Sequence, residues 1–199
     1  MIRVGFAGVP GAGKTSTARG LASMCRSIDG INNIELSAEY ARRYIAKYGK
    51  IEGVWEQFRI LNKQLDWENS VGDVDMLITD GPVFMALVYA QMLSMGTPKD
   101  IMCVNDLFSK MNKLNNPQPR YDIIFHLPPV LKPVQDGVRP ASNFDPHWRE
   151  QADKELQSVF QIFKSHLFHT VQATNMSDRL IECMGVIRTV KDTLERNTI

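Results

Sequence analysis

One short segment constrains this chain more than any other: Gly8-Val9-Pro10-Gly11-Ala12-Gly13-Lys14-Thr15. It fits the pattern G-x-x-x-x-G-K-[ST] of the phosphate-binding P-loop. Its glycines allow the backbone to curl until successive N–H groups face one anion. We expect the stretch from Gly8 to Ser16 to bind the phosphates of ATP. Lys14 would reach the β- and γ-phosphates, and the Thr15 hydroxyl would complete the coordination shell of Mg²⁺.

The residues on either side of this segment support the P-loop interpretation. Ile2 to Ala7 is typical of a short buried strand that runs directly into the loop. After the loop, Ala18, Leu21, Ala22 and Cys25 recur at helical spacing. The result is strand, loop and helix, and the helix dipole would add to the anion site. An ordinary glycine-rich turn with a surface lysine is the alternative, and this context disfavours it.

Length and composition narrow the class of protein. A chain of 199 residues with 44% hydrophobic and 23% charged residues fits one compact domain over 1–199. The net charge of +1 provides no overall field for nucleic acid or a membrane. The P-loop begins at the eighth residue, and the longest apolar run, 83–95, is too short to span a bilayer. We therefore expect a cytoplasmic protein without a membrane partner.

Predicted strands and helices alternate along the chain, which favours an α/β three-layer sandwich with a parallel sheet. After the strand at 2–7, further strands are expected at 34–37, 76–79, 121–127 and 170–173. Helices are expected after the P-loop and at 41–48, 54–65, 83–95, 97–114, 152–163 and 180–194. The segment 128–148 holds five prolines and a glycine, so we expect a long irregular loop there. Long ordered loops in compact domains tend to be functional.

Two acidic residues follow predicted strands, where an open parallel sheet places its ligands. Asp80 comes directly after the strand at 76–79, a position from which a P-loop enzyme holds Mg²⁺ or orients the attacking hydroxyl. Its alternative role is that of a turn aspartate before Gly-Pro. Glu39 follows the strand at 34–37 and could accept a proton from a substrate hydroxyl, while Arg42 could bind substrate or phosphate. A helix N-terminal glutamate with surface arginines is the alternative.

Arginines in and after the proline-rich loop indicate a lid. Asp136-Gly137-Val138-Arg139 lies inside the loop, and Arg149 follows it. Such a loop could close over the transferring phosphate, exclude water and neutralise developing charge. A solvated surface loop is the alternative. A separate cluster of Arg42, Arg43, Lys47 and Lys50, interleaved with Tyr44 and Tyr48, could bind a nucleic-acid backbone and stack bases. More often such a cluster is a solvated helix face with one functional arginine.

Taken in order, G-V-P-G-A-G-K-T, A-E-Y-A-R-R-Y, T-D-G-P, and Y-D-I-I-F-H-L with Q-D-G-V-R resemble the ribosylnicotinamide-kinase-type P-loop kinases. That family includes the kinase domain of bifunctional bacterial regulators of NAD biosynthesis. The resemblance runs from Ile2 to about Leu180 and does not extend to an adenylyltransferase domain. The chain also resembles phage thymidylate-kinase-like enzymes that phosphorylate 5-hydroxymethyluracil in DNA, which would place it in the host cytoplasm.

The resemblance implies a nucleoside- or nucleotide-kinase-like fold with a lid at about 128–150, and phosphate transfer from ATP with Mg²⁺ to a hydroxyl of a nucleoside-like acceptor. On this basis Gly13, Lys14 and Thr15 hold the triphosphate and, with Asp80, the metal. The catalytic set would be Lys14, Glu39, Asp80 and Arg139, with Glu39, Arg42 and Arg149 at the acceptor.

The sequence leaves three matters open. Either Glu39 or Asp80 could be the base, and the acceptor could be a free nucleoside or a base within DNA. A homodimer also remains open. Besides a kinase acting on a free nucleoside and one acting on DNA, the sequence allows a nucleotide-driven switch or an ATPase without a metabolic acceptor. It is disfavoured because Asn62-Lys63-Gln64-Leu65 lacks the final aspartate of the guanine motif and Gly81 follows Asp80 where an oligomeric ATPase usually has glutamate.

Overall fold

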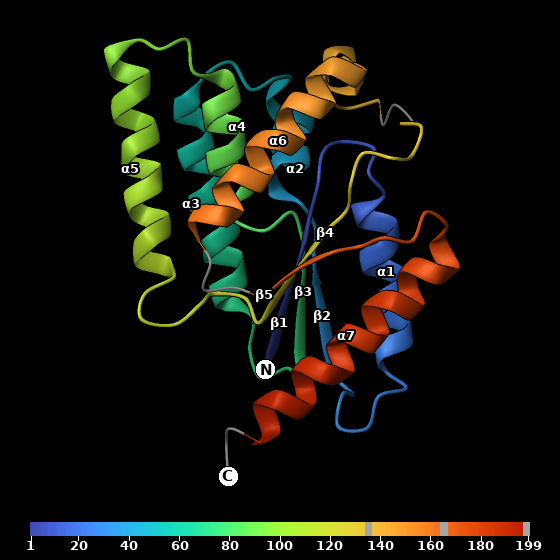
Figure 1. Ribbon diagram of the computed structural model, residues 1–199. Coiled ribbons are helices and arrows are strands. Elements are labelled where there is room, and N and C mark those ends of the chain that lie inside the picture. The colour runs from blue at the N-terminus through green and yellow to red at the C-terminus, as the bar shows by residue number, and fades with distance from the viewer. Residues whose placement is uncertain (134–136, 164–166, 197–199) are drawn as a thin grey trace.

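The computed structural model describes residues 1–133, 137–163 and 167–196, and its centre is a parallel sheet of five strands (Figure 1). The strand order is β2-β3-β1-β4-β5, and every neighbouring pair is parallel. The strands are β1(Ile2–Ala7), β2(Ile34–Ser37), β3(Met76–Asp80), β4(Ile123–His126) and β5(Leu167–Thr170). Four of the five expected strands lie where the sequence predicts them, within a few residues at their ends.

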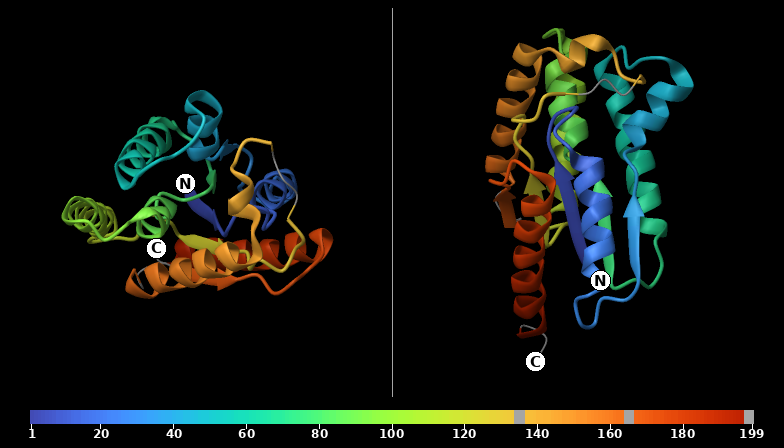
Figure 2. Two further views of the ribbon diagram at one scale, coloured as in Figure 1. Left: turned by 90° about the horizontal axis from the view of Figure 1, so that it is seen from above. Right: turned by 90° about the vertical axis from the view of Figure 1, so that its right-hand side faces the viewer.

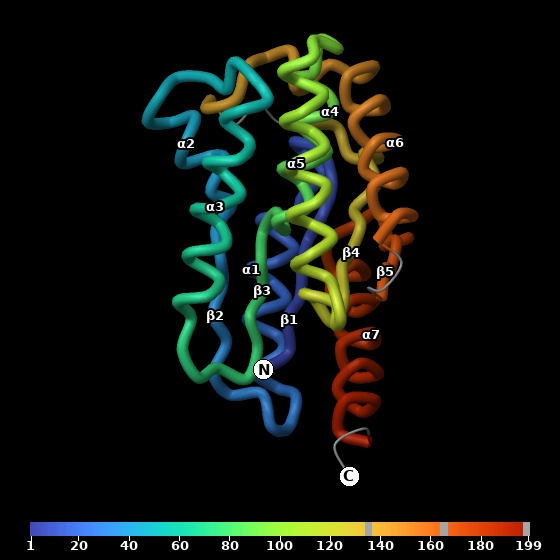
Figure 3. Tube along the Cα trace, turned by 90° about the vertical axis from the view of Figure 1, so that its left-hand side faces the viewer, coloured from blue at the N-terminus to red at the C-terminus, as the bar shows by residue number. Residues whose placement is uncertain are grey.

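Helices cover both faces of this sheet, which confirms the predicted three-layer α/β architecture (Figures 1 and 2). One face is packed against α1(Lys14–Cys25) and α7(Met176–Arg196). The other is packed against α3(Val54–Ser70), α4(Met85–Leu93) and α6(Pro146–Ile162), and α5(Pro98–Leu114) lies against α3 and α4. The short α2(Tyr40–Tyr48) follows β2, and Figure 3 shows it above the end of that strand.

The central strands are apolar on both faces because both faces are covered. Val4, Phe6 and Phe125 belong to the core beneath α1 and α7, whereas Ile124 belongs to the core beneath α4 and α6. The rings of Phe6 and Phe125 stack with centroids 5.2 Å apart, and both side chains are fully buried. Burial of one such side chain contributes about 2 kcal/mol of hydrophobic stabilisation. This core fixes the strand that leads into the P-loop.

The last strand lies three residues earlier than the sequence predicts. We expected it at 170–173, but β5 is Leu167–Thr170, paired with β4 from Ile123 to His126. The chain then leaves the sheet, because the backbone amides of Gln172 and Ala173 donate to the Glu182 carboxylate of α7 at 3.0 Å instead of to a strand. The β-branched Thr170 and Val171 favoured a strand at 170–173. The Glu182 carboxylate, which accepts the next amides in place of a neighbouring strand, is distant in sequence and gave no local signal.

The proline-rich segment is more ordered at its end than expected. We expected an irregular loop to Trp148 and a helix from Ala152, but a 3-10 helix spans Ala141–Phe144 and α6 begins at Pro146. Asp145 caps α6 by accepting a hydrogen bond from the Trp148 amide at 3.1 Å. Pro146 occupies the first turn, where proline is favourable because no amide hydrogen is needed. Five prolines in the segment concealed this start signal.

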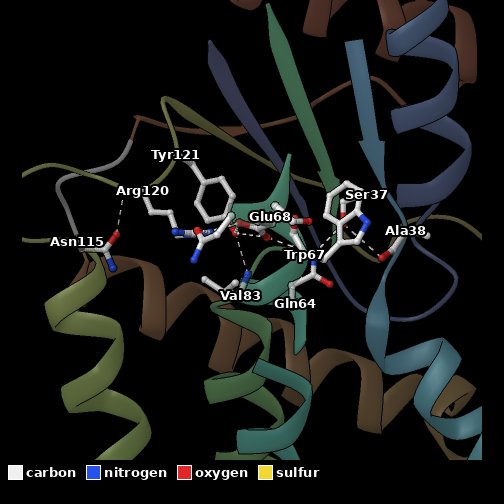
Figure 4. Close-up of polar contacts among 11 residues, drawn as sticks. Ser37, Ala38, Gln64, Trp67, Glu68, Val83, Asn115, Arg120 and Tyr121 are labelled. Carbon is white, nitrogen blue, oxygen red and sulfur yellow. Dashed lines mark hydrogen bonds and ion pairs between the residues drawn. The ribbon is translucent and has the colours of Figure 1, made fainter. Parts of the chain in front are cut away.

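A buried polar network connects α3 to β2, to the segment after β3 and to the residues just before β4 (Figure 4). The Glu68 side chain is fully buried and receives hydrogen bonds from Arg120 Nε at 3.0 Å and Tyr121 OH at 2.9 Å. Tyr121 OH in turn accepts from the Val83 amide at 3.0 Å. Gln64 donates to Glu68 and to Ser37 Oγ at 2.9 Å. These bonds hold β2, the start of β4 and the segment after β3 in fixed relation.

No described helix is both long and apolar enough to cross a membrane.

We expect Glu68→Ala to destabilise the fold by about 3 kcal/mol, because it leaves Arg120 and the Tyr121 hydroxyl buried without their acceptor. Denaturant unfolding measures this loss. Glu150→Ala is the control, since it removes a 2.7 Å ion pair with Lys154 whose side chains are 63% and 73% exposed. The control should unfold as the wild type does. Equal destabilisation by both changes would contradict the role assigned to the network.

Candidate active site

The P-loop has the curled backbone that its sequence predicts. Gly8, Gly11 and Gly13 all have positive φ angles. At Gly8 the φ is 151°, and a Cβ atom would lie 2.7 Å from the carbonyl oxygen of Leu127. That oxygen belongs to the backbone and cannot move aside, so only glycine fits there. Val9 and Ala12 are fully buried and anchor the loop in the core.

Two buried arginines hold the carbonyl groups of this loop. Arg149 Nε donates to the Pro10 carbonyl at 3.1 Å, and Arg179 Nη1 donates to the Ala12 carbonyl at 2.9 Å. Their exposed fractions are 5% and 1%. Sequence reasoning placed Arg149 at the acceptor and missed Arg179. An arginine on the closing helix carries no local signal, because its partner lies 167 residues away.

Lys14 lies between the loop and two carboxylates. Its Nζ atom donates to the carbonyls of Gly8 at 2.7 Å and Val9 at 3.1 Å. Burial lowers the pKa of Lys14, while the negative charges of Glu39 and Asp80 act in the opposite direction. The ammonium therefore lies where a terminal phosphate would meet the acidic groups.

Thr15 and Asp80 lie together, as a shared metal site requires. Thr15 Oγ1 donates to Asp80 Oδ2 at 2.5 Å. Asp80 Oδ1 is buried and has no hydrogen-bond partner among the described residues. A hydroxyl and a carboxylate oxygen are hard donors that suit Mg²⁺, which takes few protein ligands and completes its shell with phosphates and water. In the described ranges no group of three Asp, Glu, His or Cys residues could hold a metal ion by itself.

The register of the sheet brings Glu39 to the same place. Ser37 is level with Thr79, and Phe6 is level with Asp80, so the chain after β2 lies beside the ends of β1 and β3. A Cβ atom at Gly81 would be 3.2 Å from Glu39 Cγ. Glycine at this position therefore permits the close approach of the carboxylate to the end of β3.

Opposite effects act on the two carboxylates. Burial raises the pKa of Glu39, but the charges of Arg139, Lys14 and Arg42 outweigh it, and the net pKa is lowered. Burial and the charge of Glu39 raise the pKa of Asp80. Environments that separate two such pKa values are typical of acid and base assignments. Glu39 is the one whose ionised form is favoured.

Arg139, from the predicted lid, pairs with Glu39 in a buried ion pair. A cleft of about 1040 Å³, open mouth included, lies beneath this contact. Its lining includes Gly11, Gly13, Lys14, Thr15, Ser16, Arg19, Glu39, Arg42, Leu131, Lys132 and Arg139. Most predicted site residues are thus brought together, whereas Arg149 lies behind the P-loop and also donates to the Leu131 carbonyl. Asp136 lies outside the described residues.

A family model described as an AAA domain matches residues 3–179. The chain belongs to the AAA domain family. A comparison with curated protein sequences finds no match.

Several solved structures are similar to this AAA domain protein, and the chain spans about half the length of one of them, NadR. NadR in complex with NR has a TM-score of 0.69 at 20% identity, with 95% of this chain and 50% of that chain covered. The deoxyadenosine kinase of M. mycoides has a TM-score of 0.60 at 15% identity and covers 95% and 100%. The thymidylate kinase of Ehrlichia chaffeensis has a TM-score of 0.60 at 17% identity and covers 94% and 98%. At these identities the likeness establishes the fold.

We expect Asp80→Asn to raise the melting temperature at neutral pH by about 2–4 °C, because the amide removes a charge that the folded site disfavours. The folded-state pKa of Asp80 lies above the ordinary value of 3.8. Its carboxylate therefore destabilises the fold increasingly as pH rises through that pKa, and the difference between variant and wild type should vanish in acid, where both are neutral.

Thermal denaturation from about pH 2.5 to pH 8 measures this difference, since the carboxyl is neutral in both states only below its ordinary pKa of 3.8. Asp66→Asn is the control, since the Asp66 side chain is 68% exposed, and it should melt as the wild type does at every pH. A lower melting temperature for Asp80→Asn at neutral pH would contradict the charge balance described for the site.

Proposed function

We propose that this protein is an ATP- and Mg²⁺-dependent kinase that transfers the γ-phosphate to a hydroxyl of a nucleoside-like acceptor. One observation carries the proposal: the P-loop lysine and the Glu39 carboxylate line the same cleft, with an arginine of the lid paired to that carboxylate. This arrangement provides a phosphate site and a proton acceptor side by side. The likeness of the fold to nucleoside and thymidylate kinases supports it.

On the donor side, this chain would bind and orient the triphosphate. The curled backbone of the P-loop and the Lys14 ammonium would bind the β- and γ-phosphates. Thr15 Oγ1 and Asp80 would hold Mg²⁺, which supplies neutralising charge to the phosphate oxygens when bound. Arg149 and Arg179 act behind the loop by keeping its carbonyls engaged.

On the acceptor side, Glu39 would orient the hydroxyl and accept its proton. Its lowered pKa keeps it ionised near neutral pH, as a base for this step must be. Arg139 contacts Glu39 in the described structure, and we expect it to turn toward the transferring phosphate when substrates enter. There it would neutralise charge that develops on the phosphate oxygens. Arg42, which also lines the cleft, would hold the acceptor or its phosphate.

Two alternatives share this donor site. A base within DNA would replace the free nucleoside, and an ATPase would use water alone. Of the two tyrosines in the basic cluster of α2, Tyr44 is buried and Tyr48 is 55% exposed, so only Tyr48 is available for stacking on a base. We therefore favour the free nucleoside-like acceptor. The protein would act in the cytoplasm, which is that of the host cell if the chain is phage-encoded. A homodimer is compatible with this proposal.

Labelled ATP offered with thymidine, deoxyadenosine, nicotinamide riboside and hydroxymethylated duplex DNA tests the proposal. We expect label in a free nucleoside. Lys14→Ala should reduce turnover by about 10³-fold, and Glu39→Gln by about 10²–10⁴-fold. Lys99→Ala, at an exposed position on α5 outside the cleft, is the control and should retain full activity.

Label transferred to DNA alone, with rates that fall steeply in added salt, would establish the polymer as acceptor and contradict the favoured one. Acceptor-independent release of phosphate as the sole activity would establish an ATPase. Full turnover in Lys14→Ala would contradict the donor site itself.

A further inference from the structure

Two histidine–carboxylate pairs join the sheet to α6 and α7. His126, the last residue of β4, has its Nε2 atom 2.8 Å from Asp153 Oδ1 of α6, and both side chains are buried. His169 of β5 has its Nε2 atom 2.7 Å from Glu182 Oε1 of α7. None of these four side chains lines the cleft above the P-loop, so none of them can contact a bound phosphate directly.

The two pairs lie on opposite faces of the sheet. Phe125 is level with His169 and His126 is level with Thr170, and successive residues of a strand point to opposite faces. The His126 ring stacks on Phe168 with centroids 5.5 Å apart, and its Nδ1 atom lies 3.3 Å from Thr170 Oγ1. The His169 ring contacts Phe125 edge-on. Each imidazole therefore has a fixed orientation toward its own helix.

On α6, the carboxylate lies one turn from the arginine that holds the P-loop. Asp153 follows Arg149 by four residues, so the two side chains are neighbours on one face of the helix. Burial lowers the pKa of Arg149, and the charge of Asp153 opposes this effect. Gln157 donates to Asp153 Oδ2 at 2.8 Å, so both carboxylate oxygens are engaged. The pair with His126 thus fixes the rotation of α6 beside Arg149, whose Nε donates to the Pro10 carbonyl.

On α7, the same groups occur in the same order. Glu182 follows Arg179 by three residues, again one turn away. The Ala173 amide donates to the Glu182 carboxylate at 3.0 Å, and the Ala173 carbonyl accepts from Arg179 Nε at 2.9 Å. Glu182 therefore holds the segment against which Arg179 is oriented. The Nη1 atom of the same guanidinium donates to the Ala12 carbonyl.

We propose that the two histidine–carboxylate pairs are positioning groups for the phosphate site. Each pair fixes one helix against the end of a strand, so that the arginine one turn earlier reaches its carbonyl of the P-loop. Held in this way, the loop keeps its carbonyls bonded and its amides free for an anion. The inference rests on the proposed function, because it assigns both pairs to the ATP site of that kinase.

Binding to a non-hydrolysable ATP analogue with Mg²⁺, measured by calorimetric titration of the full chain well below its melting temperature, tests the inference. We expect Asp153→Ala and Glu182→Ala each to weaken binding about 10-fold. Asp153→Asn should retain most of the affinity, because it keeps an acceptor oxygen for His126. Lys154→Ala is the control, since that side chain is 73% exposed, and it should bind as the wild type does.

Hydrogen exchange of the backbone amides at 8–16, measured without nucleotide, reports on the loop itself. Asp153→Ala and Glu182→Ala should each speed exchange in this segment about 10-fold or more, because the loop samples other conformations once its arginine is released. Lys154→Ala should leave it unchanged.

A double-mutant cycle separates positioning from a general structural role. Arg149→Lys keeps the positive charge and removes the Nε donor to Pro10. In that background Asp153→Ala should cause little further loss of affinity, because the group that it positions is already altered. Additive losses would overturn the inference, as would wild-type affinity and wild-type exchange in both Asp153→Ala and Glu182→Ala.

Failure of the proposed function gives a different pattern. If the wild type binds no ATP analogue, while Asp153→Ala and Glu182→Ala speed exchange at 8–16, the pairs position the loop and the kinase proposal falls. If the wild type transfers phosphate to a nucleoside, while both variants keep its affinity and its exchange rates, the kinase proposal stands and the positioning role falls.

Discussion

The backbone of the P-loop can bind phosphate only while its carbonyl groups are held away from the cleft, and two guanidinium groups provide that restraint. Arg149 on α6 donates to the Pro10 carbonyl and Arg179 on α7 donates to the Ala12 carbonyl, and both side chains are almost fully buried. The glycines make the curl accessible, but they also allow many others. Charged donors in a buried setting select one conformation, because releasing either would leave an unpaired buried charge.

Arg149 also connects the loop to the segment that the sequence predicts as a lid, because its guanidinium donates to both the Pro10 and the Leu131 carbonyls. At the opposite wall, Arg139 of the lid pairs with Glu39. Among the described residues, the charged side chains that line the cleft are Arg19, Arg42, Arg139, Lys14, Lys132 and a single carboxylate, Glu39. Burial disfavours the ionised form of both carboxyl groups, Glu39 and Asp80. At Glu39 the positive charges of Arg139, Lys14 and Arg42 outweigh burial and lower the pKa, whereas at Asp80 burial, followed by the charge of Glu39, raises the pKa.

Sequence patterns predicted two kinds of feature: the helices and strands that follow from local residue patterns, and the side chains that lie at the ends of parallel strands. The strand, loop and helix around Lys14 were predicted correctly, and Asp80, expected directly after a strand, is the last residue of β3 and lies beside Thr15. The pairing of Arg139 with Glu39 brings together two residues that the sequence assigned to one site from segments 100 positions apart. For Asp80 and Glu39 the position at a strand end carried the information, whereas Arg139 was assigned from the proline-rich loop that contains it.

What escaped prediction depends on contacts between distant segments. Arg179 and Glu182 lie on the closing helix and act on the P-loop and on the chain after β5, and nothing near them in sequence indicates either partner. The pairing of His126 with Asp153 gave no local signal either, since aspartate at a helical position normally indicates solvent. Only the three-dimensional packing shows that both side chains are buried.

Calorimetric titration of an ATP analogue, with and without Mg²⁺, tests the central claim that this cleft is built for a metal-bound polyphosphate. With Mg²⁺ present, the account predicts that the ATP analogue binds with a dissociation constant of about 1 μM–1 mM. Chelation of the metal should weaken binding in the wild type, and Thr15→Ala should lose that dependence on metal. Absence of heat with the wild type, or metal dependence unchanged in Thr15→Ala, would contradict it.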